Sequence, residues 1–277
     1  MFEIKSDGFI KLSAFLMQKT TLKYGEVSSL IKNKDIKVNG KRVKEDIKLA
    51  SSDIVTVYAD KEKLKNDLVD IIFSDDNILV CVKPRGVNSD DFFSKVKGEN
   101  ELYYIHRLDL NTDGVMIFAK NKTAENELLL GFKNRTFIKK YLAVVLGSFK
   151  TCDGVLSDYL IKNSSANSVE IYKDKKPNSL TVKTGYKTLV KGDTTSLLEV
   201  ELFTGRTHQI RAHLAFYNHP IIGDGKYGNK DINNKLKVKN QLLTAYFLEL
   251  KFDKDSPLFY LNDKIFTYQK DYKKFII

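Results

Sequence analysis

Three short polar segments carry the residue types that could do chemistry, and each adjoins an apolar run typical of a strand. The first, residues 106–114, places Asp109 ahead of the apolar run 115–119. A carboxylate on a loop that leads into a buried strand can be held rigidly while it stays open to a ligand. Asp109 is therefore a candidate nucleophile or general base. The alternative is that His106, Arg107 and Asp109 only form a hydrogen-bond cluster within the loop.

The second segment, residues 204–213, follows an alternating run that predicts a strand over 197–203. Its side chains can donate hydrogen bonds, and they lead into a predicted helix over 206–217. It also invites a metal interpretation, because it is rich in histidine. However, His208 and His213 are five positions apart, whereas one face of a helix repeats every three or four residues. The spacing argues against a metal site.

The third segment, residues 139–147, is a predicted strand with Tyr141 near its start. A tyrosine on a strand usually belongs to the core. Beside a carboxylate site, the same ring could instead provide a flat surface on which a base stacks.

Together these segments resemble the pseudouridine synthases of the RluA type. The HRLDxxTxG box of that family is matched by residues 106–114, its KYxAxVxG strand by 140–147 and its TGRTHQIRxH box by 204–213. An upstream KPxG element lies at residues 83–86, and the resemblance spans roughly residues 70–252. Four boxes agree in the order of the family, which makes the resemblance highly specific.

The resemblance implies the roles of individual residues. Asp109 is the expected catalytic aspartate, Tyr141 packs against the target base, and Arg211 pairs with the aspartate. From its position next to Asp109, we also expect Arg107 to fill the space that a flipped base leaves or to grip a phosphate, and the alternative is a salt bridge within the loop. Further expected contacts are Leu243 with the substrate, and Lys83 and Arg206 with RNA. Asp113 departs from the family, which usually has serine there, and we expect it to add negative charge near the site.

The chemistry implied by this family needs neither a metal nor a redox cofactor, and none is expected. The N1–C1′ bond of a uridine breaks, the uracil turns, and C5 rejoins the sugar. A carboxylate can act as covalent nucleophile, at C1′ of the sugar or at C6 of the base, and so divide one difficult step into easier ones. An adjacent Arg211 would offset the cost of burying the charged Asp109.

The first sixty residues contain a second recognisable pattern. An amphipathic helix is predicted over 25–32, a basic hairpin turns at Asn39 and Gly40, and a strand over 53–58 follows. Residues 10–58 resemble the S4 RNA-binding module. Its expected RNA contacts are Lys32, Lys37, Lys41 and Arg42. The alternative is a charged hairpin that only solubilises a small domain.

The elements between these patterns predict the fold. Strands outnumber helices from residue 68 onward, so we expect an α+β fold with a mixed, mostly antiparallel sheet, preceded by the small N-terminal α/β module. A helix is expected over 123–132 with Thr123 as its cap, and residues 228–240 should form a loop. The expected domains are 1–60, a charged linker over 61–68, and a catalytic domain over 69–277.

Composition limits the classes of partner. The chain has 277 residues and a formal charge of +11, which favours a polyanion such as RNA, although a solvated lysine-rich surface would have the same charge. The apolar runs are too short to span a membrane, and the N-terminus lacks a signal-peptide core, so a cytoplasmic protein is expected. Cys81 and Cys152 are expected to be reduced and buried. No obligate protein partner is implied.

Three functions follow from these observations. The first is an RNA isomerase that flips uridines out of a structured RNA, with 23S ribosomal RNA as the expected substrate. The second is an RNA-binding assembly factor, which would have no need for a buried acid facing a polyanion. The third is a metal-dependent nuclease or a glycosidase. That class needs a metal cluster or a second acid, and Asp113 is the nearby candidate for such an acid.

Overall fold

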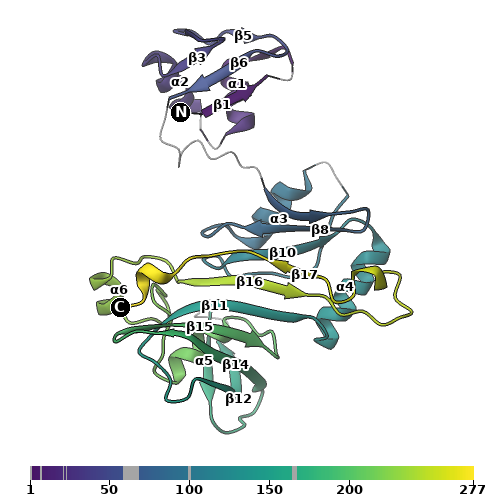
Figure 1. The fold of residues 1–277 in the computed structure, drawn as a ribbon, viewed down its shortest axis with the longest axis vertical. Helices are drawn as coiled ribbons and strands as arrows, with labels where there is room; N and C mark the ends of the chain where they lie inside the picture. The colour runs from purple at the N-terminus through teal and green to yellow at the C-terminus, as the bar shows by residue number, and fades with distance from the viewer. Residues whose placement is uncertain are drawn as a thin grey trace. The chain divides into compact units, whose positions relative to one another are not determined.

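The computed structural model describes residues 2–6, 8–20, 22, 24–58, 69–98, 101–163 and 167–277, and the chain divides into two compact units, Met1–Leu68 and Val69–Ile277 (Figure 1). The expected linker over 61–68 lies outside the described residues. No described helix combines the length and the apolar character that a membrane crossing requires.

The N-terminal unit packs two helices with short antiparallel strands. Its main sheet has the order β1-β6-β3-β4, and β2 pairs with β5. The bounds are β1 (Phe2–Lys5), β2 (Ile10–Lys11), α1 (Leu12–Lys19), α2 (Tyr24–Lys32), β3 (Ile36–Val38), β4 (Lys41–Arg42), β5 (Lys48–Leu49) and β6 (Ile54–Val57). The predicted second helix and hairpin are present. Asn39 and Gly40 both have positive φ, at 50° and 79°, which is the backbone that a tight hairpin turn requires.

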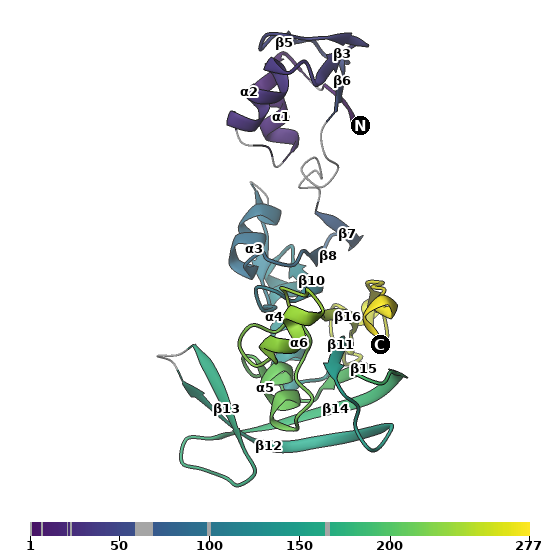
Figure 2. The same cartoon turned by 90° about the vertical axis from the view of Figure 1, so that its left-hand side faces the viewer.

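The C-terminal unit is built on one large sheet with the order β13-β12-β14-β15-β11-β16-β10-β8-β7, to which β17 adds at β16 and β9 at β10. The strands are β7 (Asp70–Ser74), β8 (Ile78–Lys83), β9 (Tyr103–Tyr104), β10 (Asp113–Ala119), β11 (Ile138–Leu146), β12 (Asp153–Asn163), β13 (Ser168–Tyr172), β14 (Leu180–Lys191), β15 (Thr195–Leu202), β16 (Leu243–Glu249) and β17 (Ile265–Thr267). Among the described strands, β10 and β16 form a parallel pair and the other pairs are antiparallel. The predicted α+β class with a mixed, mostly antiparallel sheet is confirmed. Figure 2 shows the long strands β12 and β14 side by side.

Few helices accompany this sheet. They are α3 (Ser89–Lys97), α4 (Lys122–Asn134), α5 (Gln209–Phe216) and α6 (Lys230–Lys235), with 3₁₀ turns at Phe259–Leu261 and Lys273–Phe275. Helix α4 starts before Thr123, because Asn121 is the cap and its Oδ1 accepts a hydrogen bond from the amide of Ala124 at 2.9 Å. The expected loop over 228–240 contains α6, which Asn229 caps in the same way.

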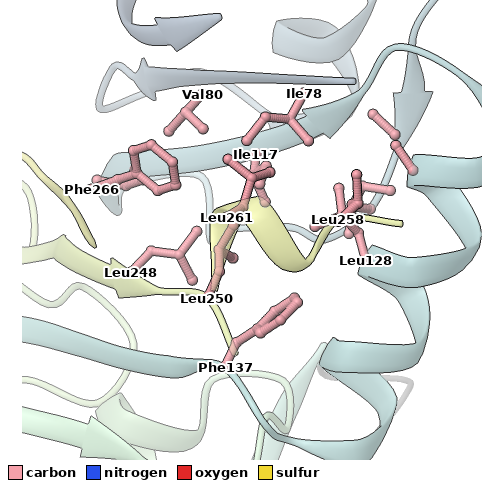
Figure 3. Packing of buried hydrophobic residues seen from close by; sticks show 14 residues of the cluster. Ile78, Val80, Ile117, Leu128, Phe137, Leu248, Leu250, Leu258, Leu261 and Phe266 are labelled. Carbon is pink, nitrogen blue, oxygen red and sulfur yellow. The ribbon is translucent and has the colours of Figure 1, made fainter. Parts of the chain in front are cut away.

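A buried apolar cluster holds the middle of the sheet against α4. Ile117 of β10, Leu248 of β16 and Leu128 of α4 point toward one another with Phe137 and Phe266 (Figure 3). This packing fixes strand β10, the strand that follows the Asp109 loop.

Glycine is required where β10 begins. Gly114 has a φ of 127°, and a Cβ on it would lie 2.1 Å from the carbonyl oxygen of Ala245 on β16. The two backbones can therefore approach only because residue 114 has no side chain. The same contact fixes the end of the Asp109 loop against the sheet.

The cysteines differ from the expectation at one position. Both are free thiols and Cys81 is buried in β8, but Cys152 is exposed. Cys152 lies in a turn just before β12 rather than inside an apolar strand, so it has no core to enter.

Candidate active site

A pocket of about 430 Å³ lies in the C-terminal unit. Its lining comes from the loop before β10, the C-terminal end of α4, the first residues of β11, the turn that joins β15 to α5, the first residues of α5, and the first residue of β16. It contains Asp109, Tyr141, Arg211, Arg107, Leu243 and Arg206. The fold thus gathers the site residues expected in this unit, with the exception of Lys83.

Asp109 combines a fixed position with access to solvent. Its Oδ2 accepts a hydrogen bond from Nη1 of Arg211 at 3.0 Å, and its side chain remains 24% exposed. The loop around it is closed by backbone bonds, since the amide of Thr112 donates to the carbonyl of Asp109 at 3.0 Å. A carboxylate in this setting is paired with a cation, oriented and open to a ligand.

Arg211 bridges two carboxylates. Its Nε donates to Oδ2 of Asp224 at 2.7 Å and its Nη2 donates to Oδ1 of Asp224 at 3.0 Å, while its Nη1 donates to Asp109. Burial would lower the pKa of Arg211, but the hydrogen bonds and charges of Asp224 and Asp109 outweigh it and raise that pKa. Arg211 is therefore a permanent cation that holds Asp109 from one side.

Asp224 is a site residue that the sequence analysis did not single out. Burial would raise its pKa, but Arg211 and two backbone amides, those of Tyr227 and Lys226, lower it overall. It stands thirteen positions after Arg211, a separation that no local periodicity connects. In the sequence, Asp224 is one of several polar residues that follow α5. Only the fold brings it next to Arg211.

Tyr141 forms a wall of the pocket near Asp109. Its backbone pairs with Val200 on one side and Ala245 on the other, which fixes the strand that carries it. Burial, together with the charge of Asp109, raises the pKa of Tyr141, so the phenol stays protonated. Leu243 lies in the same pocket and is almost fully buried. The pair provides a flat ring and an aliphatic contact.

The residues beside Asp109 do not form a local hydrogen-bond cluster. His106 accepts a hydrogen bond from the amide of Ile117 at 3.2 Å and stacks on Phe132, with 4.6 Å between ring centroids. Burial and then Lys139 lower the pKa of His106 to about 3, so the ring is neutral. Arg107 is exposed, and within the described ranges it makes no ion pair. The side chain of Arg107 is thus available to a ligand.

The expected contact of Lys83 with RNA does not fit its placement. The side chain is 0% exposed, and its ammonium donates to the carbonyls of Pro84, Val87 and Leu110 at 3.0, 2.7 and 3.2 Å. Those bonds tie the turn after β8 to the loop that holds Asp109. Lys83 therefore supports the site from behind, and the assignment to RNA binding is corrected.

The negative charge of Asp113 is also compensated. Its carboxylate is buried, and it accepts hydrogen bonds from Arg85 at 2.9 Å and Thr244 at 2.6 Å, while the ammonium of Lys270 lies 2.8 Å away. It does not line the pocket. The expectation that Asp113 adds negative charge to the site is therefore wrong, because two cations surround it.

The histidines of the second segment have separate partners. His213 is buried between Thr184 and Asp158, each at 2.9 Å. His208 contacts the hydroxyl of Tyr227 at 3.1 Å, and His219 contacts the carbonyl of Leu146 at 3.0 Å. Within the described ranges, no three His, Cys, Asp or Glu side chains gather as metal ligands would. Each of these histidines therefore has its own hydrogen-bond partner in the protein.

The basic residues of the N-terminal hairpin surround an aromatic ring. Lys37 and Arg42 pair across β3 and β4, and their cationic groups lie 5.2 and 5.8 Å from the ring centroid of Tyr58. Lys41, at the turn, and Lys32, at the end of α2, are both exposed. These positions suit contacts with a phosphate backbone, which stay a prediction.

Comparison with known proteins points to one family. The family model described as RNA pseudouridylate synthase matches residues 77–216, which contain Asp109, Tyr141 and Arg211. An uncharacterized RNA pseudouridine synthase of Mycoplasma capricolum is 32% identical, over 93% of this chain and 94% of its own length.

Two further relatives carry more specific names. A ribosomal large subunit pseudouridine synthase C of Vibrio vulnificus is 31% identical over 73% of this chain and 70% of its own. A ribosomal large subunit pseudouridine synthase D of Borreliella burgdorferi is 31% identical over 79% of this chain and 75% of its own length. Among solved structures, human RNA pseudouridylate synthase domain containing 1 is 25% identical, with a TM-score of 0.60 over 75% of this chain and 93% of that one.

Proposed function

The chain belongs to the RNA pseudouridylate synthase family, and from this premise we propose that Asp109 is the nucleophile with which it isomerises uridines of large-subunit ribosomal RNA. The enzyme class follows from membership, so the chain is an isomerase that acts on RNA. The nucleophile, the flipped base and the ribosomal substrate are the parts proposed. The observation that carries them is the Asp109–Arg211–Asp224 chain in a pocket that Tyr141 and Leu243 also line.

Each group has a role that its geometry supports. Asp109 attacks the target nucleotide, at C1′ or at C6, and forms a covalent adduct in which the N1–C1′ bond breaks. C1′ then bonds to C5, which loses its proton while N1 gains one, and Asp109 is released. Arg211 keeps the carboxylate oriented, with Nη1 at 3.0 Å. The ring of Tyr141 stacks on the uracil, and Leu243 packs against it. The base thus stays in the pocket while it turns.

The target uridine must leave its stack to reach Asp109. Extrusion costs a few kcal/mol, and the cost falls when the base is already unpaired. Arg107 is exposed beside Asp109 and has no ion pair among the described side chains, so it can occupy the vacated position or hold a phosphate. This role is compatible with its place on the pocket wall.

The ribosomal substrate rests on the relatives and on charge. Two relatives at 31% identity are named for the large ribosomal subunit. The formal charge of +11 favours a large polyanion. The basic hairpin of the N-terminal unit, which resembles the S4 module, provides a second contact that raises the effective concentration of RNA at the pocket.

The proposal is tested with Asp109→Asn. The amide has the same shape but cannot form the adduct, so we expect RNA affinity to stay within about twofold while turnover falls by about a thousandfold or more. Tritium release from C5-labelled uridine in ribosomal RNA of a deletion strain measures turnover, and Asp174→Asn, an exposed acid outside the pocket, is the control. Substantial activity in Asp109→Asn would exclude the nucleophile. Wild-type protein that binds the RNA without releasing tritium would instead indicate a binding protein.

A further inference from the structure

The pocket holds more positive charge than the proposed chemistry uses. Its lining has one acid, Asp109, and six basic residues: Arg107, Lys133, Arg135, Lys139, Arg206 and Arg211. Arg211 is committed to Asp109 and Asp224. The other five make no ion pair with a carboxylate in the part of the chain that the structure describes. Uncompensated cations in a concave site favour an anionic ligand.

The backbone of Arg206 is fixed by hydrogen bonds, although part of its guanidinium group makes none. Its amide donates to Oε1 of Gln209 at 3.1 Å, and its carbonyl accepts from the amide of Gln209 at 3.1 Å. Gln209 is fixed in turn by Thr204 at 2.8 Å and by Thr184 at 3.0 Å. Nevertheless the Nε of Arg206 is buried and has no hydrogen-bond partner. Most buried donors in folded proteins are paired, so the guanidinium of Arg206 keeps hydrogen-bonding capacity that the described protein groups do not use.

Lys139 lies beside the same turn. Lys140 pairs with Glu201, so the register of β11 and β15 brings Lys139 next to the end of β15. Its Nζ lies 3.9 Å from where a Cβ on Gly205 would stand, directly before Arg206. Burial, and then the charge of Arg135, lower the pKa of Lys139. Lys139 is thus a partly desolvated cation next to a second cation, with no described acid bound to either.

We propose that Lys139, Arg135 and Arg206 form a subsite for one phosphodiester group of the RNA strand, next to the nucleotide at Asp109. The inference rests on the proposed function only in that the pocket receives an RNA strand. A phosphate offers oxygens that a guanidinium and an ammonium can both bind, and its charge offsets the repulsion between Lys139 and Arg135. A neutral base could accept hydrogen bonds but would leave that repulsion in place.

The subsite would fix the position of the RNA strand along the pocket. Contacts to phosphate hold a strand in one position without reading its sequence. Binding energy gained there can be used to keep the extruded nucleotide against Asp109 rather than in its stack. The three residues are therefore positioning residues for the reaction, in addition to their contribution to affinity.

Binding of the full-length protein to a fluorescein-labelled RNA of about nine nucleotides, with one central uridine, provides the test. We expect Lys139→Met and Arg206→Met each to weaken binding about tenfold, because each removes a charged hydrogen bond. The slope of log affinity against log salt should fall by about 0.7 for each. Lys187→Met removes an exposed charge outside the pocket and is the matched control. Arg206→Lys retains a cation and should recover part of the affinity if Arg206→Met folds poorly.

The identity of the ligand is tested by replacing single phosphates with neutral methylphosphonates. Neutralising one linkage beside the uridine should weaken wild-type binding about tenfold and weaken Lys139→Met by a smaller factor, because Lys139 no longer contributes there while Arg135 and Arg206 still do. If every linkage affects both proteins by the same factor, or if Lys139→Met binds like the wild type, the subsite does not exist. Pseudouridine formation by the wild type is scored separately, so loss of the proposed function would be visible independently of these affinities.

Discussion

Three nitrogen atoms of Arg211 donate hydrogen bonds to two carboxylates, those of Asp224 and Asp109. This arrangement determines how Asp109 is oriented. Two of these hydrogen bonds go to the fully buried Asp224 and one to the partly exposed Asp109. The bidentate pair with Asp224 fixes the plane of the guanidinium, and the fixed plane then orients the third bond. In the proposed mechanism, Asp224 would act on the reaction through Arg211, as a positioning residue for Asp109.

The variant Asp224→Asn tests this arrangement. The amide keeps the shape of the side chain but loses the charge and one acceptor, so the guanidinium can rotate and Asp109 loses its fixed orientation. We expect kcat to fall by roughly tenfold to a hundredfold while KM changes little, as for other partners of a site residue. Single-turnover tritium release measures the effect, with Asp255→Asn, an exposed acid outside the pocket, as the control. Unchanged kcat in Asp224→Asn would mean that Arg211 is positioned by other contacts.

Among the residues of the site, the sequence predicted those that belong to a recognisable motif. Asp109, Tyr141 and Arg211 stand in three boxes, and the fold places them in one pocket. Asp224 and Lys139 could not be assigned in this way. Their importance depends on which strand end meets which turn, and that is decided by sheet register rather than by spacing along the chain.

At the scale of elements, the site depends on how β8 and β10 end. Lys83 is the last residue of β8, and its ammonium joins Pro84 and Val87 to Leu110, the residue after Asp109. Burial lowers the pKa of Lys83 to about 8, although Asp113 and Asp109 oppose the shift. A buried cation here is retained at a cost, because three carbonyls need its donors.

Lys83→Met is expected to be destabilised by about 1 to 3 kcal/mol at pH 7, since those carbonyls lose their donor. The pKa of Lys83 is lowered in the folded state, from 10.5 to about 8, so the unfolded chain binds more protons between these values. The contribution of Lys83 to the free energy of unfolding of the wild type therefore rises with pH across this range. The methionine variant lacks this contribution. The difference in the free energy of unfolding between the two proteins should widen by roughly 1 to 2 kcal/mol from pH 8 to 9.5.

Urea unfolding at several pH values measures this gap. Lys187→Met, which removes an exposed lysine of β14, should follow the wild-type curve throughout. Parallel curves for the wild type and Lys83→Met would show that the folded-state pKa of Lys83 is not lowered.

Strands and helices were predictable to different degrees. The apolar runs over 78–82 and 115–119 became β8 and β10, because a short, continuous apolar run with β-branched residues is a local signal for a buried strand. Helix α3 was not predicted, although Asn88 caps it and Asp90 and Asp91 occupy its first turn. The parallel pairing of β10 with β16 is a contact between segments more than a hundred residues apart, and no local pattern contains it.

At the scale of the whole molecule, basic charge is present in both units. The pocket has its surplus cations, and the N-terminal unit has a hairpin whose Lys37 and Arg42 flank Tyr58. If both bind RNA, the chemistry and much of the affinity belong to different parts of the chain. Changes in the hairpin should then affect binding far more than the chemical step.

Neutralising Lys37, Lys41 and Arg42 to glutamine tests this separation. The slope of log RNA affinity against log salt should fall by roughly two units, since each lost phosphate contact contributes about 0.7 to 0.9. Turnover at saturating RNA should persist, because Asp109, Tyr141 and Arg211 lie in the other unit. A matched triple variant at Lys5, Lys11 and Lys48, which are exposed in the same unit but outside this hairpin, should keep the wild-type slope. Equal losses in the two triple variants would assign the effect to net charge alone, and a wild-type slope in the hairpin variant would make the hairpin a solvated surface without a role in RNA binding.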